Sequence, residues 1–285
     1  METQLELSSP AKINLWLRVL GRRDDGFHEV QTRLCRIGVE DSLVIERVDD
    51  PSIRVLTCSD PTVPTDGANL VLRALEAFET AGGPRLGWRI RLEKRIPHGA
   101  GLGGGSSNAA VALAAFNRLT GDVLSEGDLL RLASSLGSDV PCFLGTSTAA
   151  DGCGRGERVT PVAFPWELPL VLIKPPFPVS TPWAYSRWKD SVERPDVPYC
   201  PQTLPWGEMV NDLERPVFEK YLLLPALKGW LLKQAETRAA LMSGSGATVF
   251  AVTSSMADAE SLADRAKAYT GSTAWIQVAQ TLPSV

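Results

Sequence analysis

The segment IPHGAGLGGGSSNAA, residues 96–110, holds five glycines within seven positions, followed directly by two serines. Glycine costs chain entropy in a folded segment, so such a cluster needs a physical reason. One reason is a close approach of the backbone to an anion, because the free amides and the dipole at a helix N-terminus favour a phosphate. The other is a structural turn or a mobile linker. The loop by itself leaves both interpretations open.

The loop differs from the two commonest glycine-rich phosphate loops. A Walker A loop carries a lysine next to its last glycine, whereas here Ser106 follows Gly105 directly. The glycine loop of protein kinases joins two strands and accompanies HRD and DFG segments, neither of which occurs in this sequence. A phosphate at this loop would therefore need positive charge from elsewhere in the chain.

Length and charge restrict the classes of function. The chain has 285 residues, which is enough for a sizeable core and two domains. Its net charge of −4 gives no electrostatic case for nucleic-acid binding. No apolar run approaches the roughly 18 residues of a membrane span, and the acidic start METQLELSSPAK is unlike a signal or transit peptide. We therefore expect no membrane partner and no nucleic-acid partner.

The five cysteines are widely spaced and include no C-x-x-C pair. An odd number at such spacings disfavours a disulfide framework or a zinc site. Unpaired cysteines are typical of a reducing compartment, so we expect a cytoplasmic protein.

The elements around the glycine loop can be predicted from periodicity. The segment GWRIRLEKRI, residues 87–96, alternates apolar and charged side chains, which predicts a strand with one wet face. The segment 106–121 predicts a helix with most of its circumference buried, in which Ser106 or Ser107 caps the start and Gly121 closes the end.

The remaining predicted strands and helices do not alternate regularly along the chain. Strands are expected up to Val48, and helices at 69–83 and at 125–137, the latter with a capping box of Ser125 and Asp128. In the second half we expect a buried strand at 168–174, a loop at 195–208, a short Gly/Ser loop running into a strand at 241–252, a helix at 257–271 and a strand at 273–280. This order predicts an α+β fold, with a domain boundary near residue 160.

Four segments together resemble the GHMP kinases, the family of galactokinase, homoserine kinase, mevalonate kinase and phosphomevalonate kinase. They are residues 8–32, 96–110, 137–157 and 242–252. The spellings PAKINL, DGFH, GLGGGSSNAA and SDVPCFL, supported by PVSTPWAY and NDLE in the second half, resemble the members that act on the diphosphocytidyl derivative of methylerythritol. The resemblance spans nearly the whole chain.

The resemblance implies a two-domain GHMP kinase fold. The N-terminal domain, 1–160, would contain a left-handed βαβ crossover, and the C-terminal domain, 161–285, would be ferredoxin-like, with the active site in the cleft between them. It implies an ATP-dependent small-molecule kinase that uses Mg²⁺, phosphorylates the 2-hydroxyl of a cytidine diphosphate substrate in the non-mevalonate isoprenoid pathway, and works as a monomer or homodimer.

The resemblance also assigns the residues of the phosphoryl-transfer site. Asp139 would accept the proton of the attacking hydroxyl, Lys12 would stabilise the developing charge, and Asn14 would help to hold the substrate. The ATP phosphates would lie against the loop, at Pro97, Gly99, Ala100, Gly101, Leu102, Gly103, Gly104, Gly105, Ser106 and Ser107. Either serine could instead bind Mg²⁺ or merely cap the helix, so the metal ligands stay open.

The substrate would contact residues from both halves of the chain. Phe27 and His28 would recognise the cytosine, with phenylalanine standing where tyrosine is the familiar residue, so that stacking is kept and a phenol hydrogen bond is lost. Thr181, Tyr185, Gly244 and Ser245 would line the rest of the substrate site. His98 has no assigned role and is expected to be a partly exposed loop residue.

Two alternatives remain open. Another GHMP kinase, acting on homoserine or a mevalonate derivative, is disfavoured by the DGFH and GGGSS spellings. A nucleotide-binding regulator that has lost catalysis is disfavoured because Lys12 and Asp139 are both present.

Overall fold

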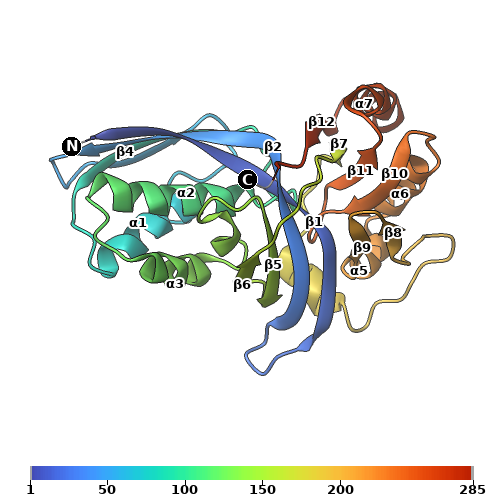
Figure 1. The fold of residues 1–285 in the computed structure, drawn as a ribbon, viewed down its shortest axis with the longest axis horizontal. Helices are drawn as coiled ribbons and strands as arrows, with labels where there is room; N and C mark the ends of the chain where they lie inside the picture. The colour runs from blue at the N-terminus through green and yellow to red at the C-terminus, as the bar shows by residue number, and fades with distance from the viewer. Residues whose placement is uncertain (1, 284–285) are drawn as a thin grey trace.

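The computed structural model describes residues 2–283, in an α+β arrangement of two sheets with helices packed on them (Figure 1). The strands are β1 (Gln4–Arg22), β2 (His28–Val48), β3 (Arg54–Cys58), β4 (Gly87–Glu93), β5 (Ala149–Gly154), β6 (Arg158–Pro161), β7 (Pro169–Lys174), β8 (Gln202–Leu204), β9 (Gly207–Asn211), β10 (Thr237–Met242), β11 (Val249–Thr253) and β12 (Trp275–Gln280). The helices are α1 (Leu70–Thr80), α2 (Gly104–Leu119), α3 (Glu126–Leu136), α4 (Thr181–Arg187), α5 (Glu214–Lys220), α6 (Leu223–Leu232) and α7 (Met256–Thr270), with a short 3-10 turn, η1 (Pro141–Phe143).

The larger sheet is built on the long antiparallel pair β1 and β2. Its strand order is β3-β4-β2-β1-β9-β8, and β5 and β6 extend it from β2. Helices α1, α2 and α3 lie together on one side of this sheet (Figure 1). The core between them contains Trp88, whose ring meets Phe116 edge-on at 4.8 Å between centroids. Figure 1 also shows that β1 and β2 continue beyond these helices and end in a projecting hairpin.

The predicted alternation of β4 is confirmed. Trp88, Ile90 and Leu92 are buried in the core, and the charged residues between them are exposed. The helices predicted at 69–83 and 125–137 are confirmed as α1 and α3, and Ser125 and Asp128 form the predicted capping box.

The helix after the glycine loop is confirmed with most of its residues buried, but its predicted cap is wrong. The N-cap of α2 is Gly103, in a left-handed conformation with φ of 71°, and no side chain caps the helix. Ser107 lies within the first turns, and its hydroxyl accepts a hydrogen bond from Ser9 at 2.8 Å. A glycine starts the helix because the loop must turn sharply there, and only glycine adopts that conformation at low cost.

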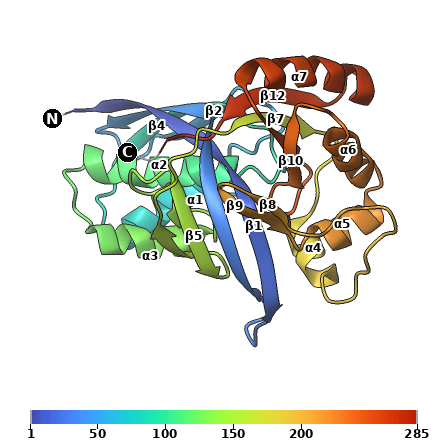
Figure 2. The same ribbon diagram turned by 45° about the vertical axis from the view of Figure 1, so that its right-hand side comes forward.

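The second sheet has the order β10-β11-β7-β12, and all of its neighbouring strands are antiparallel. Figure 2 shows α7 lying along the β7 and β12 side of this sheet, and α6 packs against β10 and β11. The strands predicted at 168–174, 241–252 and 273–280 and the helix at 257–271 are confirmed as β7, β11, β12 and α7.

The loop predicted at 195–208 is partly wrong, because its end forms strands. β8 and β9 make a hairpin with Pro205 and Trp206 in its turn, and Gly207, the first residue of β9, has a φ of 118°. β9 then pairs in parallel with β1, with Asn211 opposite Leu17. This hairpin therefore belongs to the larger sheet, although it follows the predicted boundary near residue 160 in the chain. That boundary stays a prediction. Across residues 2–283, none of the helices has the length and apolar character that a membrane crossing requires.

Candidate active site

A cavity of about 470 Å³ lies where the glycine loop meets β1 and the second sheet. Its walls include residues 97–106 without a gap, Lys12 and Asn14 from β1, Asp139, and Gly244 and Ser245 from the loop between β10 and β11. Four distant parts of the chain therefore meet in one cavity.

Lys12 and Asp139 face one another in this cavity. The Nζ atom of Lys12 lies 3.3 Å from Oδ2 of Asp139, and the Lys12 side chain is only 4% exposed. Nζ also donates a hydrogen bond of 2.7 Å to Oδ1 of Asn14, which lies two residues along the same face of β1. The Nδ2 of Asn14 donates in turn to Thr32 on β2 at 2.8 Å. These contacts hold the ammonium group in one position.

The segment that carries Asp139 is held from β2. Arg36 is buried, and its guanidinium donates to the carbonyl of Cys142 at 2.8 Å and to those of Leu144 and Gly145 at 3.3 Å. Burial lowers the pKa of Arg36. Arg36 lies directly opposite Lys12 in the β1–β2 register, so one strand pair fixes both sides of the Lys12–Asp139 contact.

The N-terminus of α2 opens into the cavity. Because Gly103 provides no side-chain cap, the amide groups of the first turn have no side-chain partner, and such amides favour an anion. Gly104, Gly105 and Ser106 all line the cavity. Ser107 does not, because its amide donates to the carbonyl of Gly103 at 2.9 Å and its hydroxyl is buried against Ser9.

The second glycine loop touches the first. The hydroxyl of Ser243 donates to the carbonyl of Gly101 at 3.0 Å, and the amide of Thr248 donates to the carbonyl of Ala100 at 3.2 Å. A Cβ atom at Gly101 would lie 2.3 Å from the carbonyl oxygen of Ser243. Glycine is therefore required at position 101 by this contact between the loops.

A second cavity, of about 790 Å³, adjoins the first. It is lined by aromatic rings, namely Phe27, His28, Tyr185 and Trp188. The residues that line both cavities are Ser138, Arg155, Thr181 and Tyr185. Thr181 also lies 2.7 Å from Ser245, oxygen to oxygen, which joins α4 to the second glycine loop. The two cavities thus form one continuous site.

His28 packs against two of these rings. The centroid of its ring lies 5.3 Å from that of Tyr185 and 6.2 Å from that of Trp188. Burial lowers the pKa of His28, and the charge of Arg22 lowers it further, so the imidazole is neutral at pH 7. Burial raises the pKa of Tyr185, and the nearby charge of Asp139 raises it further, so the phenol is neutral as well.

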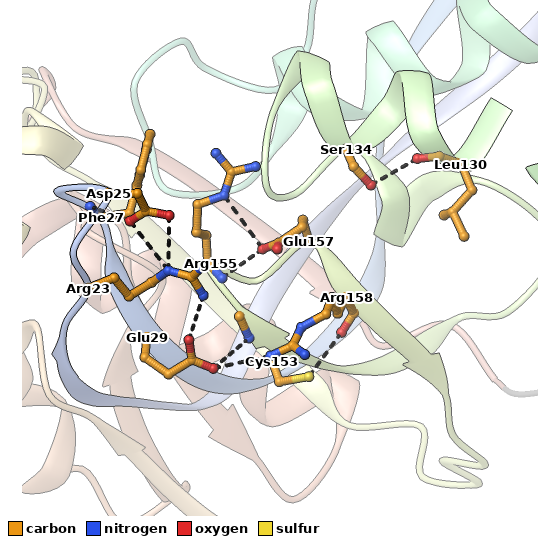
Figure 3. A network of polar contacts seen from close by, with 11 residues as sticks. Arg23, Asp25, Phe27, Glu29, Leu130, Ser134, Cys153, Arg155, Glu157 and Arg158 are labelled. Atoms are coloured by element: carbon orange, nitrogen blue, oxygen red, sulfur yellow. Dashed lines mark hydrogen bonds and ion pairs between the residues drawn. The ribbon is translucent and has the colours of Figure 1, made fainter. Parts of the chain in front are cut away.

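Phe27 sits at the tip of the β1–β2 hairpin and is 51% exposed. Figure 3 shows the polar network that ties this tip to the turn between β5 and β6. Glu29 accepts from Arg23 at 2.7 Å on one side and from the amide of Gly154 at 3.2 Å on the other. The guanidinium of Arg155 lies 4.7 Å from the centre of the Phe27 ring, which is a cation–π contact.

Sequence reasoning missed two cations of the site. Lys94 lines the first cavity just after the end of β4, and its ammonium pairs with the buried carboxylate of Asp41. Arg155 lines both cavities from the β5–β6 turn. Lys94 could have been singled out because it breaks the alternation of the strand just before the glycine loop. Arg155 gave no local signal, because its place depends on the pairing of two hairpins.

Comparisons with known proteins agree with this arrangement. The model of the GHMP kinases N terminal domain matches residues 69–146, and that of the GHMP kinases C terminal domain matches residues 203–271.

Three relatives are similar over most of the chain. A 4-diphosphocytidyl-2-C-methyl-D-erythritol kinase of Methylacidiphilum infernorum is 42% identical over 96% of each chain. The protein of that name from Protochlamydia amoebophila is 40% identical over 87% of this chain and 84% of its own. A crystal structure of a 4-(cytidine 5'-diphospho)-2C-methyl-D-erythritol kinase superposes with a TM-score of 0.79 and 35% identity, covering 98% of this chain and all of the other. The chain therefore belongs to the GHMP kinases and, among them, to the family of the 4-diphosphocytidyl-2-C-methyl-D-erythritol kinases.

Proposed function

We propose that this chain is an ATP-dependent kinase that phosphorylates the 2-hydroxyl of 4-diphosphocytidyl-2-C-methyl-D-erythritol, in the non-mevalonate isoprenoid pathway. The names of its relatives support this substrate. The observation that carries the proposal is the Lys12–Asp139 pair, 3.3 Å apart, beside an aromatic cavity that continues into the cavity of the glycine loop. A nucleoside fits the aromatic cavity, and a polyphosphate fits the cavity of the glycine loop.

The ATP phosphates lie against the start of α2. The residues of the first helical turn line the cavity, and their free amides and the helix dipole both attract an anion. Ser106 is the serine of this loop that lines the cavity, so its hydroxyl is the one available to a phosphate oxygen or to a metal. Lys94 lies close by and adds a second cation, although Asp41 balances part of its charge.

The residues present suit a metal held mainly by the nucleotide. Mg²⁺ in kinases keeps several waters and is bound by one or two carboxylates together with phosphates. In the part of the chain that the structure describes, no cluster of three or more acidic, histidine or cysteine side chains could hold a metal ion. Asp139 and Ser106 are the cavity residues that would hold it beside ATP. When bound, the ion neutralises charge on the phosphates.

Asp139 accepts the proton of the attacking hydroxyl, and Lys12 stabilises the developing charge. Phosphoryl transfer depends mostly on positioning and electrostatics, which suits an ammonium that is held by two oxygen ligands in a buried site. Asn14 fixes the direction of the ammonium through its carbonyl oxygen. The carboxylate of Asp139 is 35% exposed, so a substrate hydroxyl can reach it.

The cytidine end of the substrate occupies the aromatic cavity. Phe27 and Tyr185 offer ring faces for stacking, and the neutral imidazole of His28 offers both a donor and an acceptor for the polar edge of cytosine. Thr181, Gly244 and Ser245 line the first cavity between this end and Lys12, so they face the middle of the substrate. Arg155, which lines both cavities, lies where the diphosphate crosses from one to the other.

A homoserine or mevalonate kinase would have no use for the aromatic cavity. A turnover assay with purified protein, ATP and Mg²⁺ separates the three substrates. We expect phosphorylation of the diphosphocytidyl substrate, with kcat/KM at least about 10³-fold above that for homoserine or mevalonate, because buried polar groups reject substrates that leave them unpaired. Equal or higher turnover of either competitor would refute the proposed substrate, and no turnover of any would favour a regulator.

We further propose that the enzyme works in the cytoplasm, which its five free cysteines favour. We propose a monomer or homodimer, because residues of one chain line both cavities. Light scattering after gel filtration measures the mass against 30.8 kDa per chain.

A further inference from the structure

Asn211 is a buried amide at the end of β9 whose hydrogen bonds all go to backbone groups. Its Nδ2 donates to the carbonyl of Met242 and to the carbonyl of Gly244, both at 2.7 Å. Its Oδ1 accepts from the amide of Leu213 at 2.9 Å. Both N–H donors of the side chain are therefore used on the second glycine loop.

The rest of the NDLE segment anchors Asn211 on both sides. The carboxylate of Asp212 accepts from the amide of Val19 on β1 at 2.8 Å. The carboxylate of Glu214 accepts from the amide of Met242 at 2.9 Å, and its other oxygen pairs with buried Lys228 at 2.6 Å. The segment thus joins the strand that carries Lys12 to the start of the second glycine loop.

The loop held by Asn211 reaches the reacting groups. A Cβ atom at Gly244 would lie 3.3 Å from Nζ of Lys12 and 3.4 Å from Oδ1 of Asn14, so the backbone of Gly244 packs directly against that pair. Ser243, between the two carbonyls that Asn211 binds, holds the carbonyl of Gly101 in the ATP loop. A shift of residues 242–244 would therefore move the wall behind Lys12 and the ATP loop together.

Asn211 also sets the direction of one amide. In a trans peptide the carbonyl and the following N–H point in opposite directions. Because the Gly244 carbonyl points at Asn211, the N–H of Ser245 points away from Asn211, and Ser245 lines the cavity.

We propose that Asn211 is a positioning residue for phosphoryl transfer: it fixes the Met242 and Gly244 carbonyls, so that Gly244 holds Lys12 and Asn14 in place and the Ser245 amide faces the bound substrate. Asn211 itself touches neither ATP nor substrate. The inference rests on the proposed function, since its main measurement is turnover of the diphosphocytidyl substrate by the wild-type enzyme and its variants.

Two variants test the role of the amide. Asn211→Leu keeps the volume and removes every hydrogen bond. Asn211→Asp keeps the acceptor for Leu213 but places a carboxylate against two carbonyls, and only its protonated form can donate to one of them. We expect kcat to fall on the order of 10- to 100-fold in both, which corresponds to the loss of two hydrogen bonds at the site, with KM changed less than about threefold.

Asn117 provides a matched control. It is a buried asparagine at the end of α2 that donates to the carbonyl of Leu124 at 3.0 Å and accepts from the amide of that residue at 2.9 Å, but it lines neither cavity. Asn117→Leu and Asn117→Asp should lower the melting temperature by as much as the Asn211 variants. Their kcat should stay within about twofold of the wild type, because a loop far from Lys12 is loosened.

The pH dependence separates positioning from a general loss of structure. The ratio of kcat for Asn211→Asp to kcat for wild type should rise as the pH falls, because protonation restores one donor, and dividing by the wild-type value removes the pH dependence that both enzymes share. The proposal is overturned if the Asn211 variants lose melting temperature as the Asn117 variants do while kcat stays within twofold of wild type. If Asn211→Leu does not fold, the pH ratio of Asn211→Asp decides, and a flat ratio overturns the proposal. Absence of turnover in the wild type would instead refute the proposed function.

Discussion

Gly105→Ala separates the two explanations of the glycine-rich loop. A methyl group at this position meets nothing closer than a side-chain carbon of Leu70 at 3.7 Å, which is an ordinary contact, and Gly105 has no left-handed backbone. Gly105 is also the second residue of α2 and lines the cavity. The protein itself therefore has no need of glycine there, and any need must come from a ligand.

The expected changes have opposite signs for stability and for ATP binding. Replacing an unstrained helical glycine by alanine stabilises a protein by roughly 0.5–1 kcal/mol. For a chain of this size that raises Tm by about 1–4 °C. If a phosphate approaches the backbone at Gly105, the methyl group prevents one charge-assisted hydrogen bond worth about 1.5–3 kcal/mol. The Kd for ATP should then rise on the order of 10- to 100-fold.

Gly127→Ala is the matched control, because Gly127 is likewise the second residue of a helix, α3, and its nearest neighbour is 3.8 Å away. Calorimetric melting and titration with a non-hydrolysable ATP analogue give both quantities for each variant. Both should melt higher than wild type, and only Gly105→Ala should bind the analogue more weakly. Equal affinity in the two variants would refute phosphate binding at this turn and leave a structural turn as the explanation.

Three further outcomes follow from the site. Asp139→Asn keeps the shape of the base and removes its function, so kcat should fall on the order of 10²- to 10⁴-fold with the KM for the cytidine substrate near wild type, measured by steady-state turnover; near-wild-type kcat would exclude Asp139 as the base. Burial lowers the pKa of His28, so the folded protein favours the neutral imidazole, and the KM for the cytidine substrate should rise as the pH falls below 6.5 and through that lowered pKa. At higher pH this KM should not change with pH, and in His28→Gln it should not change over the whole pH range. An equal rise of the KM at acid pH in His28→Gln would contradict the role assigned to His28. Glu214→Gln leaves buried Lys228 without its anion and should lower the free energy of unfolding by about 3–5 kcal/mol, measured by urea titration. Adding Lys228→Met to this variant should restore most of the lost stability. An unchanged unfolding midpoint in Glu214→Gln would show that the ion pair is not needed.

Local patterns predicted most of the elements correctly because their causes are local. The alternation in residues 87–96 follows from one buried face, and the capping box of α3 follows from Ser125 and Asp128 three residues apart. The hairpin of β8 and β9 was missed because β8 is only three residues long and β9 also pairs in parallel with β1, nearly two hundred residues earlier in the chain. No pattern within residues 195–208 reports that partner.

In the candidate site, too, local features could be predicted from the sequence and contacts between distant residues could not. The glycine loop could be singled out from its own residues, but the contact between Lys12 and Asp139 joins positions in different elements, and no spacing rule specifies it. Only the family resemblance brought these two residues together. The serine cap predicted for α2 was wrong because the hydroxyl of Ser107 is buried and accepts a hydrogen bond from Ser9 on β1. This is a tertiary contact, which the local sequence does not report.

The packing around Lys12 explains why separate glycine motifs occur in one chain. A Cβ atom at Gly103 would lie 3.0 Å from Cγ of Lys12, and one at Gly244 would lie 3.3 Å from Nζ. The stem and the ammonium of this lysine thus pass between two backbones that have no side chains, and Asp139 closes the remaining side at 3.3 Å. A substituent at either glycine would displace the same ammonium. The two loops and the PAKIN strand therefore constrain one another through a single side chain, and the density of glycine here reflects the path of Lys12 as well as any approach of a phosphate.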